Sequence, residues 1–144
     1  MHIKESFGDI INSAARNMKK QLEDKIKQYD ITTSQWSVLK ILSEENNLTQ
    51  ADIAEKLSAD RATTGAVVDK LITKNLIHRN QCEGDRRAYS ICITDHGLKL
   101  AEKITVEAEK CNNEALYGFK EEEIVQFIDY LRRVNKNVDK EKKL

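Results

Sequence analysis

The sequence predicts a mainly helical protein that carries one short β-hairpin, and three observations lead to this fold class. The 144 residues include no proline and only five glycines, which favours long helices. Both ends of the chain carry apolar residues at three- and four-residue steps, the period of an amphipathic helix. Between them lie two shorter helical patterns and two strand-like runs, the second of which has the period-2 alternation of a half-buried strand. A chain of this length forms one domain over residues 1–144, with room for helical extensions.

The first long helix is expected over residues 7–29. Its apolar stripe is wide for a helix on a surface, so the helix needs a partner to cover it. The polar residues that start at Asp30 end this helix, and Thr33 or Ser34 is expected to cap the next one. That second helix carries Trp36, Val38, Leu39, Ile41 and Leu42.

Two short helices follow, separated by a tight break at residues 58–60. Thr49 can cap the first and Asp60 the second, because their side-chain oxygens accept from backbone N–H groups without helical partners. Asn75 is expected to end the second helix in the left-handed conformation that asparagine tolerates. The buried stripe of this helix is predicted to be Thr64, Val67, Val68 and Leu71, with Ile72 beside it, and the opposite face Arg61, Ala62, Thr63, Gly65, Ala66, Asp69 and Lys70.

Two strands are expected over residues 76–82 and 88–94, joined by the polar loop at residues 83–87. Arg86 and Arg87 stand in that loop with no apolar neighbour to pack on, and Asp85 can orient one guanidinium by a charge-assisted hydrogen bond. Guanidinium groups so placed suit phosphates or a narrow minor groove. A helix, a turn, a helix and then an arginine-tipped hairpin are typical of a winged helix-turn-helix, which places one helix in the DNA major groove.

Two more helices complete the chain. Thr94 is expected to cap a long helix from residue 95 to about residue 116, with Cys111 on its apolar side. Residues 117–120 interrupt the pattern, and the acids of residues 121–123 then open a last helix at the positive end of its dipole. The residues expected to face inward on the last helix are Ile124, Phe127, Ile128, Leu131 and Val134.

Five segments lie in a fixed order over residues 48–97: Leu48-Thr49-Gln50 with Ile53-Ala54, Val68-Asp69-Lys70-Leu71, Lys74-Asn75-Leu76-Ile77, Asp85-Arg86-Arg87, and Ile93-Thr94-Asp95-His96-Gly97. Together they resemble the MarR family of bacterial winged helix-turn-helix transcription regulators. The family usually has glycine where Asn75 stands, and both residues tolerate the same backbone. Gly65 and Ala66 fall where many members carry larger polar or basic side chains, so the base-reading set stays open.

The resemblance implies a homodimer that binds a palindromic operator in double-stranded DNA, as a repressor released by a small aromatic or phenolic ligand. The apolar stripes at both chain ends independently favour a symmetric dimer. Residues 33–94 would form the DNA-binding lobe, and residues 1–32 and 95–144 the dimerisation helices. The predicted DNA-binding residues are Gln50, Arg61, Ala62, Thr63, Gly65, Ala66, Lys70, Asp85, Arg86 and Arg87.

The resemblance also implies a ligand site where the dimer helices meet the DNA-binding lobe. A cationic group and an indole near one cleft could hold an aromatic carboxylate, which makes Arg16 and Trp36 the candidates. An ion pair and a core tryptophan are the plainer interpretation of the same two residues. The identity of an effector is not readable from the sequence.

Other function classes fit less well. The sequence has no Gly-rich phosphate loop, nucleophile elbow or metal-ligand cluster, so we expect no enzyme, no cofactor and no metal. His78 and Cys92 are expected to face each other across the hairpin, which is too few ligands for structural zinc. A redox-responsive regulator that uses Cys82, and a winged helix that binds proteins, remain the alternatives.

Charge and hydropathy set further limits. The 24 Lys and Arg residues equal the 24 Asp and Glu residues, so a DNA-binding protein of this composition must concentrate positive charge locally. No apolar run approaches the ~20 residues of a membrane span, and the N-terminus lacks a signal-peptide pattern. We therefore expect a soluble cytoplasmic protein.

Overall fold

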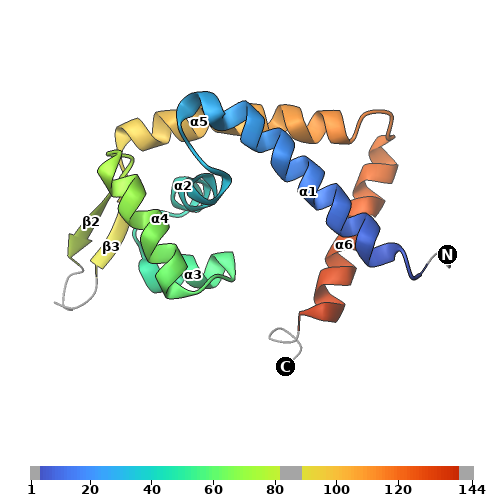
Figure 1. Cartoon of the computed structure of the whole chain (residues 1–144), viewed down its shortest axis with the longest axis horizontal. Coiled ribbons are helices and arrows are strands. Elements are labelled where there is room, and N and C mark those ends of the chain that lie inside the picture. The colour runs from blue at the N-terminus through green and yellow to red at the C-terminus, as the bar shows by residue number, and fades with distance from the viewer. Residues whose placement is uncertain (1–3, 82–88, 140–144) are drawn as a thin grey trace. The chain divides into compact units, whose positions relative to one another are not determined.

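The computed structural model describes residues 4–81 and 89–139, and the chain divides into two compact units, one up to Cys111 and one from Asn112. The predicted class is confirmed, since the elements are mainly helices with one small antiparallel sheet (Figure 1). In chain order the elements are α1 (Phe7–Ile26), a short 3-10 helix η1 (Lys27–Tyr29), α2 (Thr33–Glu44), β1 (Leu48–Thr49), α3 (Gln50–Leu57), α4 (Arg61–Thr73), β2 (Ile77–Gln81), β3 (Tyr89–Ile93), α5 (Asp95–Ala115) and α6 (Glu121–Val138).

The start of α2 differs from the sequence-based expectation. Thr32 caps the helix, because its hydroxyl accepts from the backbone N–H of Gln35 at 3.1 Å. The Gln35 side chain in turn accepts from the backbone N–H of Thr32 at 3.3 Å. The prediction of Thr33 or Ser34 was wrong, since only the residue three positions before the glutamine can complete this reciprocal capping box.

The sheet has three strands in the order β1-β3-β2, one more than the sequence predicted. β1 has two residues, Leu48 and Thr49, which is too short for a period-2 pattern to be recognised. β3 pairs antiparallel with both neighbours, and the predicted pairing of His78 with Cys92 is confirmed. The Cys92 thiol is buried and donates to the Asn47 side-chain oxygen at 2.6 Å.

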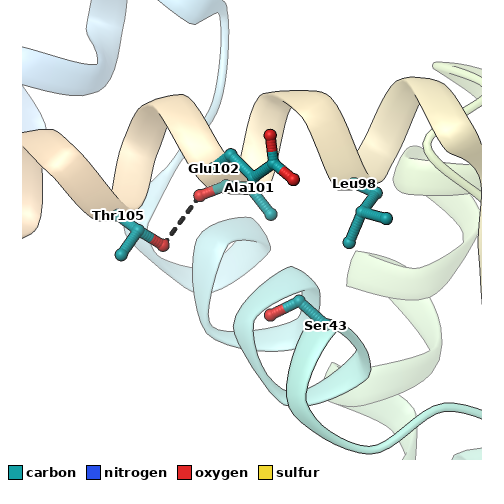
Figure 2. Close-up of a pocket in the computed structure, with 5 residues that line it drawn as sticks. All are labelled: Ser43, Leu98, Ala101, Glu102 and Thr105. Atoms are coloured by element: carbon teal, nitrogen blue, oxygen red, sulfur yellow. Dashed lines mark hydrogen bonds between the residues drawn. The ribbon is translucent and has the colours of Figure 1, made fainter.

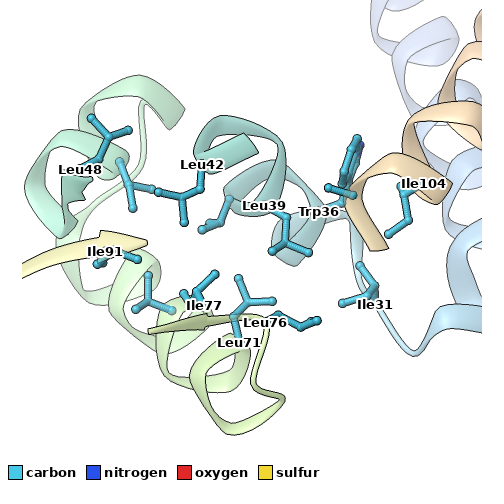
Figure 3. Close-up of a cluster of buried hydrophobic side chains, with 14 of the residues drawn as sticks. Ile31, Trp36, Leu39, Leu42, Leu48, Leu71, Leu76, Ile77, Ile91 and Ile104 are labelled. Carbon is cyan, nitrogen blue, oxygen red and sulfur yellow. The ribbon is translucent and has the colours of Figure 1, made fainter. Parts of the chain in front are cut away.

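The core lies between α2, α4, α5 and the sheet (Figure 3). Leu39 and Leu42 of α2 meet Leu71 of α4, and Ile77 and Ile91 close the cluster from β2 and β3. The predicted burial of the α4 stripe is confirmed at its three innermost positions, Thr64, Val68 and Leu71, each at most 1% exposed.

The junction between α4 and α5 is held by a cap and a close backbone approach. Asn75 is left-handed, with φ of 59°, as predicted. The Thr94 hydroxyl donates to the Asn75 carbonyl at 2.7 Å and accepts from the Gly97 N–H at 3.0 Å, which confirms Thr94 as a cap. A Cβ on Gly97 would lie 2.1 Å from the Leu76 carbonyl oxygen, so only glycine fits there. The start of α5 is thereby fixed to the end of α4.

The terminal helices keep much of their apolar surface exposed in the single chain. At the start of α6, the Glu123 side chain accepts from the backbone N–H of Lys120. Further along this helix, Phe127 is 43% and Ile128 is 41% exposed. On α1, Phe7 and Ile10 are 49% and 61% exposed. The expectation that the α6 stripe faces inward is therefore not met within one chain. Within the described ranges, no helix combines the length and apolarity that a bilayer crossing requires.

Candidate nucleic-acid interface

Helix α3 begins at a reciprocal cap. The Thr49 hydroxyl accepts from the Asp52 N–H at 3.1 Å, and the Asp52 carboxylate accepts from the Thr49 N–H at 3.1 Å. The backbone N–H of Thr49, and then its hydroxyl, lower the pKa of Asp52 below its usual value. The predicted cap is confirmed, and it fixes Gln50 as the first residue of α3.

Helix α4 begins at the predicted cap Asp60. One carboxylate oxygen accepts from the Thr63 N–H at 2.7 Å, and the other accepts from the Thr63 hydroxyl at 2.9 Å. The Thr63 backbone N–H, and then its hydroxyl, lower the pKa of Asp60. The predicted break before this cap is also present, since Ser58 is left-handed with φ of 52°. Thr63 is exposed, and its hydroxyl oxygen keeps a free lone pair for a hydrogen-bond donor on a ligand.

The predicted DNA-facing residues of α4 fall into two rows at four-residue spacing. Residues four apart on a helix lie one above the other. One row is Arg61, Gly65 and Asp69, in which Gly65 is half-buried. The other row is Ala62, Ala66 and Lys70, which are all exposed.

The first row is partly covered by Gln50 of α3. The Gln50 side-chain nitrogen donates to the Arg61 carbonyl oxygen at 3.5 Å, a long hydrogen bond. A Cβ added to Gly65 would lie 2.9 Å from that same nitrogen. Gly65 therefore makes room for Gln50, a reason for its small size that the sequence did not indicate.

Arg79 of β2 joins the same cluster. One guanidinium nitrogen lies 2.9 Å from an Asp69 carboxylate oxygen and donates to the Gln50 side-chain oxygen at 3.3 Å. Arg79 was left out of the predicted DNA-binding set. Alternation along β2 places Arg79 on the same side of the strand as Ile77, which packs toward α4, and this could have indicated that Arg79 approaches that helix. We call Gln50, Gly65, Asp69 and Arg79 the Arg79 cluster.

The C-terminal end of α4 is attached to the junction of α1 and α2. The Lys74 ammonium donates to the Gln35 side-chain oxygen at 3.1 Å and to the Asp30 carbonyl oxygen. It also lies 3.6 Å from the Asp30 carboxylate. Both ends of α4 are thus connected by side-chain hydrogen bonds to other parts of the chain, Arg61 to Gln50 and Lys74 to Asp30 and Gln35.

Several predicted site residues are not brought into this cluster. Asp85, Arg86, Arg87 and Cys82 lie outside the described residues, and Cys92 and Cys111 are buried. Of the two candidate ligand residues, Trp36 is 6% exposed and belongs to the core, whereas Arg16 is exposed on α1.

A cavity of about 320 Å³ lies between α2 and α5 (Figure 2). Its lining side chains are largely small or hydroxyl-bearing, and the Thr105 hydroxyl donates to the Ala101 carbonyl at 2.8 Å. The lining residues are Ser43, Leu98, Ala101, Glu102 and Thr105.

Residues 31–89, which carry α2, the helix-turn-helix of α3 and α4, and β2, match the family model described as "MarR family". Over this stretch the chain is similar to the MarR family of winged helix-turn-helix transcriptional regulators. It is 29% identical over 122 residues to YwoH of Bacillus subtilis, described as an uncharacterized HTH-type transcriptional regulator, with 85% of this chain and 88% of that protein covered. The S. aureus MepR–DNA complex is 28% identical with a TM-score of 0.86, over 92% of this chain and 98% of MepR.

The transcriptional regulator SlyA is similar to the same extent, with 28% identity and a TM-score of 0.86 over 94% of this chain and 95% of SlyA. The MarR family consists of DNA-binding transcriptional regulators and not of enzymes. Three predictions are thereby confirmed: the family, a DNA-binding regulator as the function, and no enzymatic activity.

Proposed function

We propose that this MarR-like protein is a homodimeric, sequence-specific repressor that acts in the cytoplasm on a palindromic operator. The observation that carries the proposal is the exposed row Ala62, Ala66 and Lys70 on α4. Two alanines allow the helix to approach base edges closely, and a lysine one turn further on can pair with a phosphate. The helix-turn-helix of α3 and α4 presents this row as a recognition helix does in the major groove.

The dimer is supported by apolar surface that one chain leaves exposed on α1 and α6. Phe7, Ile10, Phe127 and Ile128 are all more than 40% exposed. A two-fold dimer would cover such surfaces and place two recognition helices about one turn of DNA apart. The DNA complex of the relative MepR supports double-stranded DNA as the ligand.

Base preference is assigned to Arg61 and Thr63, both exposed in the first turn of α4. Replacing either with alanine should change which operator bases matter, and removing one good base interaction should cost about 1–3 kcal/mol of binding free energy. Equal weakening on all sequences would instead mean that Arg61 binds a phosphate.

The wing interaction is assigned to Arg87, with Arg86 beside it and Asp85 orienting the guanidinium. These residues connect β2 to β3. Arg87→Ala should make the salt dependence of operator binding shallower, by about one charge for each phosphate that is no longer neutralised. Asp85→Ala should have part of the same effect. If the salt titration of Arg87→Ala overlays that of the wild type, the wing does not contact DNA.

Release by a small aromatic or phenolic ligand is the finer part of the proposal. The cavity between α2 and α5 is the candidate site, because its volume of about 320 Å³ suits one aromatic ring. The Glu102 carboxylate there can accept from a phenol hydroxyl. Arg16 on α1 remains the proposed partner for a carboxylate, although neither Arg16 nor buried Trp36 is among the residues that line this cavity.

One experiment tests the main claims together. The purified protein is titrated against its own upstream intergenic DNA and against a shuffled duplex, with and without a panel of phenols and aromatic acids. We expect preferential binding to the upstream DNA, release by one class of compound, and a dimer by light scattering. A monomer at micromolar concentration, or equal binding to both duplexes, would contradict the proposal.

A further inference from the structure

The Arg79 cluster joins three elements at the edge of the exposed face of α4. Gln50 is the first residue of α3, Asp69 lies near the end of α4, and Arg79 lies on β2 at the base of the wing. The ion pair between Arg79 and Asp69 is short, at 2.9 Å, whereas the bond from Arg79 to Gln50 is longer, at 3.3 Å. Arg79 is therefore anchored by Asp69 and positions Gln50.

Both polar ends of the Gln50 amide are engaged inside the protein. Its oxygen accepts from Arg79, and its nitrogen donates to the carbonyl oxygen of Arg61. The amide consequently lies across Gly65, in the space that a side chain at that position would occupy. Each amide end still has one hydrogen-bonding position free, and a glutamine amide is the group that pairs bidentately with adenine.

We propose that Arg79 is a positioning residue for base readout: anchored by Asp69, it holds the Gln50 amide across Gly65 at the edge of the recognition face. This inference rests on the proposed sequence-specific function. A planar guanidinium suits the task because its N–H groups point in fixed directions, which a lysine ammonium does not offer.

The competing interpretation is that Arg79 binds a DNA phosphate, since its side chain is 39% exposed. The two interpretations predict opposite effects of Asp69→Ala. If Arg79 binds phosphate, removing the acid releases the guanidinium and removes a repulsive charge, so affinity for every duplex rises by the same factor and the ratio of selected to scrambled affinity is unchanged. If Arg79 positions Gln50, removing the acid frees Arg79 from its anchor, so Asp69→Ala behaves like Arg79→Ala.

Gly65→Ala tests the same arrangement from the other side. Alanine is more favourable than glycine in a helix interior, so thermal stability should hold or rise. The added Cβ displaces the Gln50 amide, so base preference should fall. In the presence of Gln50→Ala, Gly65→Ala should have no further effect on preference, because nothing remains to be displaced. If the cluster had only a structural role, a variant would lose base preference only when it also lost thermal stability.

The experiment uses the full chain and a duplex selected by the wild type from a random pool, with a scrambled duplex as reference. The variants are Arg79→Ala, Asp69→Ala, their double variant, and Gly65→Ala with and without Gln50→Ala. Lys110→Ala is the control, because it removes an exposed cation that pairs with Glu107 on α5, away from the cluster. Fluorescence polarisation gives both affinities, and thermal unfolding gives stability.

We expect each of the variants Arg79→Ala, Asp69→Ala and Gly65→Ala to lower the ratio of selected to scrambled affinity about tenfold, the size of one good base interaction. The double variant at positions 79 and 69 should fall no further, and the control should keep the wild-type ratio. If Asp69→Ala binds both duplexes more tightly and keeps the wild-type ratio, or if the ratio is unchanged in all variants, the positioning role of Arg79 is overturned while the proposed function stands. Failure of the wild type to select any duplex would overturn the proposed function as well.

Discussion

Helices α4 and α6 carry similar apolar stripes and have opposite surroundings. On α4, Val68 and Leu71 are completely buried among residues of the same chain. On α6, Phe127 and Leu131 are 43% and 38% exposed. The apolar face of α4 is therefore covered within one chain, whereas the apolar face of α6 needs a surface from outside the chain to cover it. Mutations on the buried face of α4 should therefore change the stability of the fold, and mutations on the apolar face of α6 should change dimerisation.

The largest expected effect comes from charging the α6 face. Ile128→Asp combined with Leu131→Asp should give a monomer, because a carboxylate is costly to bury at an apolar interface. Operator affinity should then fall about 10²–10⁴-fold, the gain that linking two binding modules provides. Light scattering and polarisation measure the two effects. Gln126→Asp is the control, since Gln126 is exposed and lies on the opposite side of α6 from Ile128 and Leu131. If the double variant stays dimeric, this face of α6 is not part of the dimer interface.

The next effect concerns the core face of α4. Leu71→Ala should destabilise the fold by about 2–5 kcal/mol, because it leaves a cavity in a packed core. The matched change on α6 is Val125→Ala, where the side chain is 64% exposed and the cost should stay within about 0.5 kcal/mol. Urea unfolding measures both. Equal destabilisation at the two positions would mean that α6 is as well packed as α4.

A smaller and opposite effect is expected at Thr64 on the same face. Its hydroxyl is buried and has no hydrogen-bond partner among the described residues. Thr64→Val replaces that hydroxyl with a methyl group of similar shape, so stability should rise by about 1 kcal/mol. A decrease in stability in the same urea experiment would show that the hydroxyl makes a bond that is needed.

The smallest effect concerns the caps of α3 and α4. Because hydrogen bonds in the folded state lower the pKa values of Asp52 and Asp60, both stabilise the fold above the ordinary carboxyl pKa of 3.8. This contribution is lost as pH falls through the lowered pKa values. Thermal unfolding from neutral pH to about pH 2.5 should show a fall that Asp52→Asn combined with Asp60→Asn makes shallower. Parallel profiles for variant and wild type would show that the caps do not titrate there.

Much of the fold could be predicted because it depends on interactions within a few residues. The caps Thr49, Asp60 and Thr94 each bond three residues ahead, and a left-handed residue such as Asn75 is recognisable by its type. The buried stripe of α4 follows from its period alone. The DNA-binding residues of the wing and the ligand residues remain predictions.

The order of the elements, most helix ends, the buried face of α4 and the resemblance to the family all follow from the sequence. The contacts among the remaining polar residues depend on how the elements pack. Gln50, Gly65 and Arg79 are brought together over separations of 15 and 29 positions, and β1 exists only because Leu48 and Thr49 pair with β3. The physical reason is range: periodicity and capping act within one or two helical turns, whereas these long-range interactions form only after the core has packed.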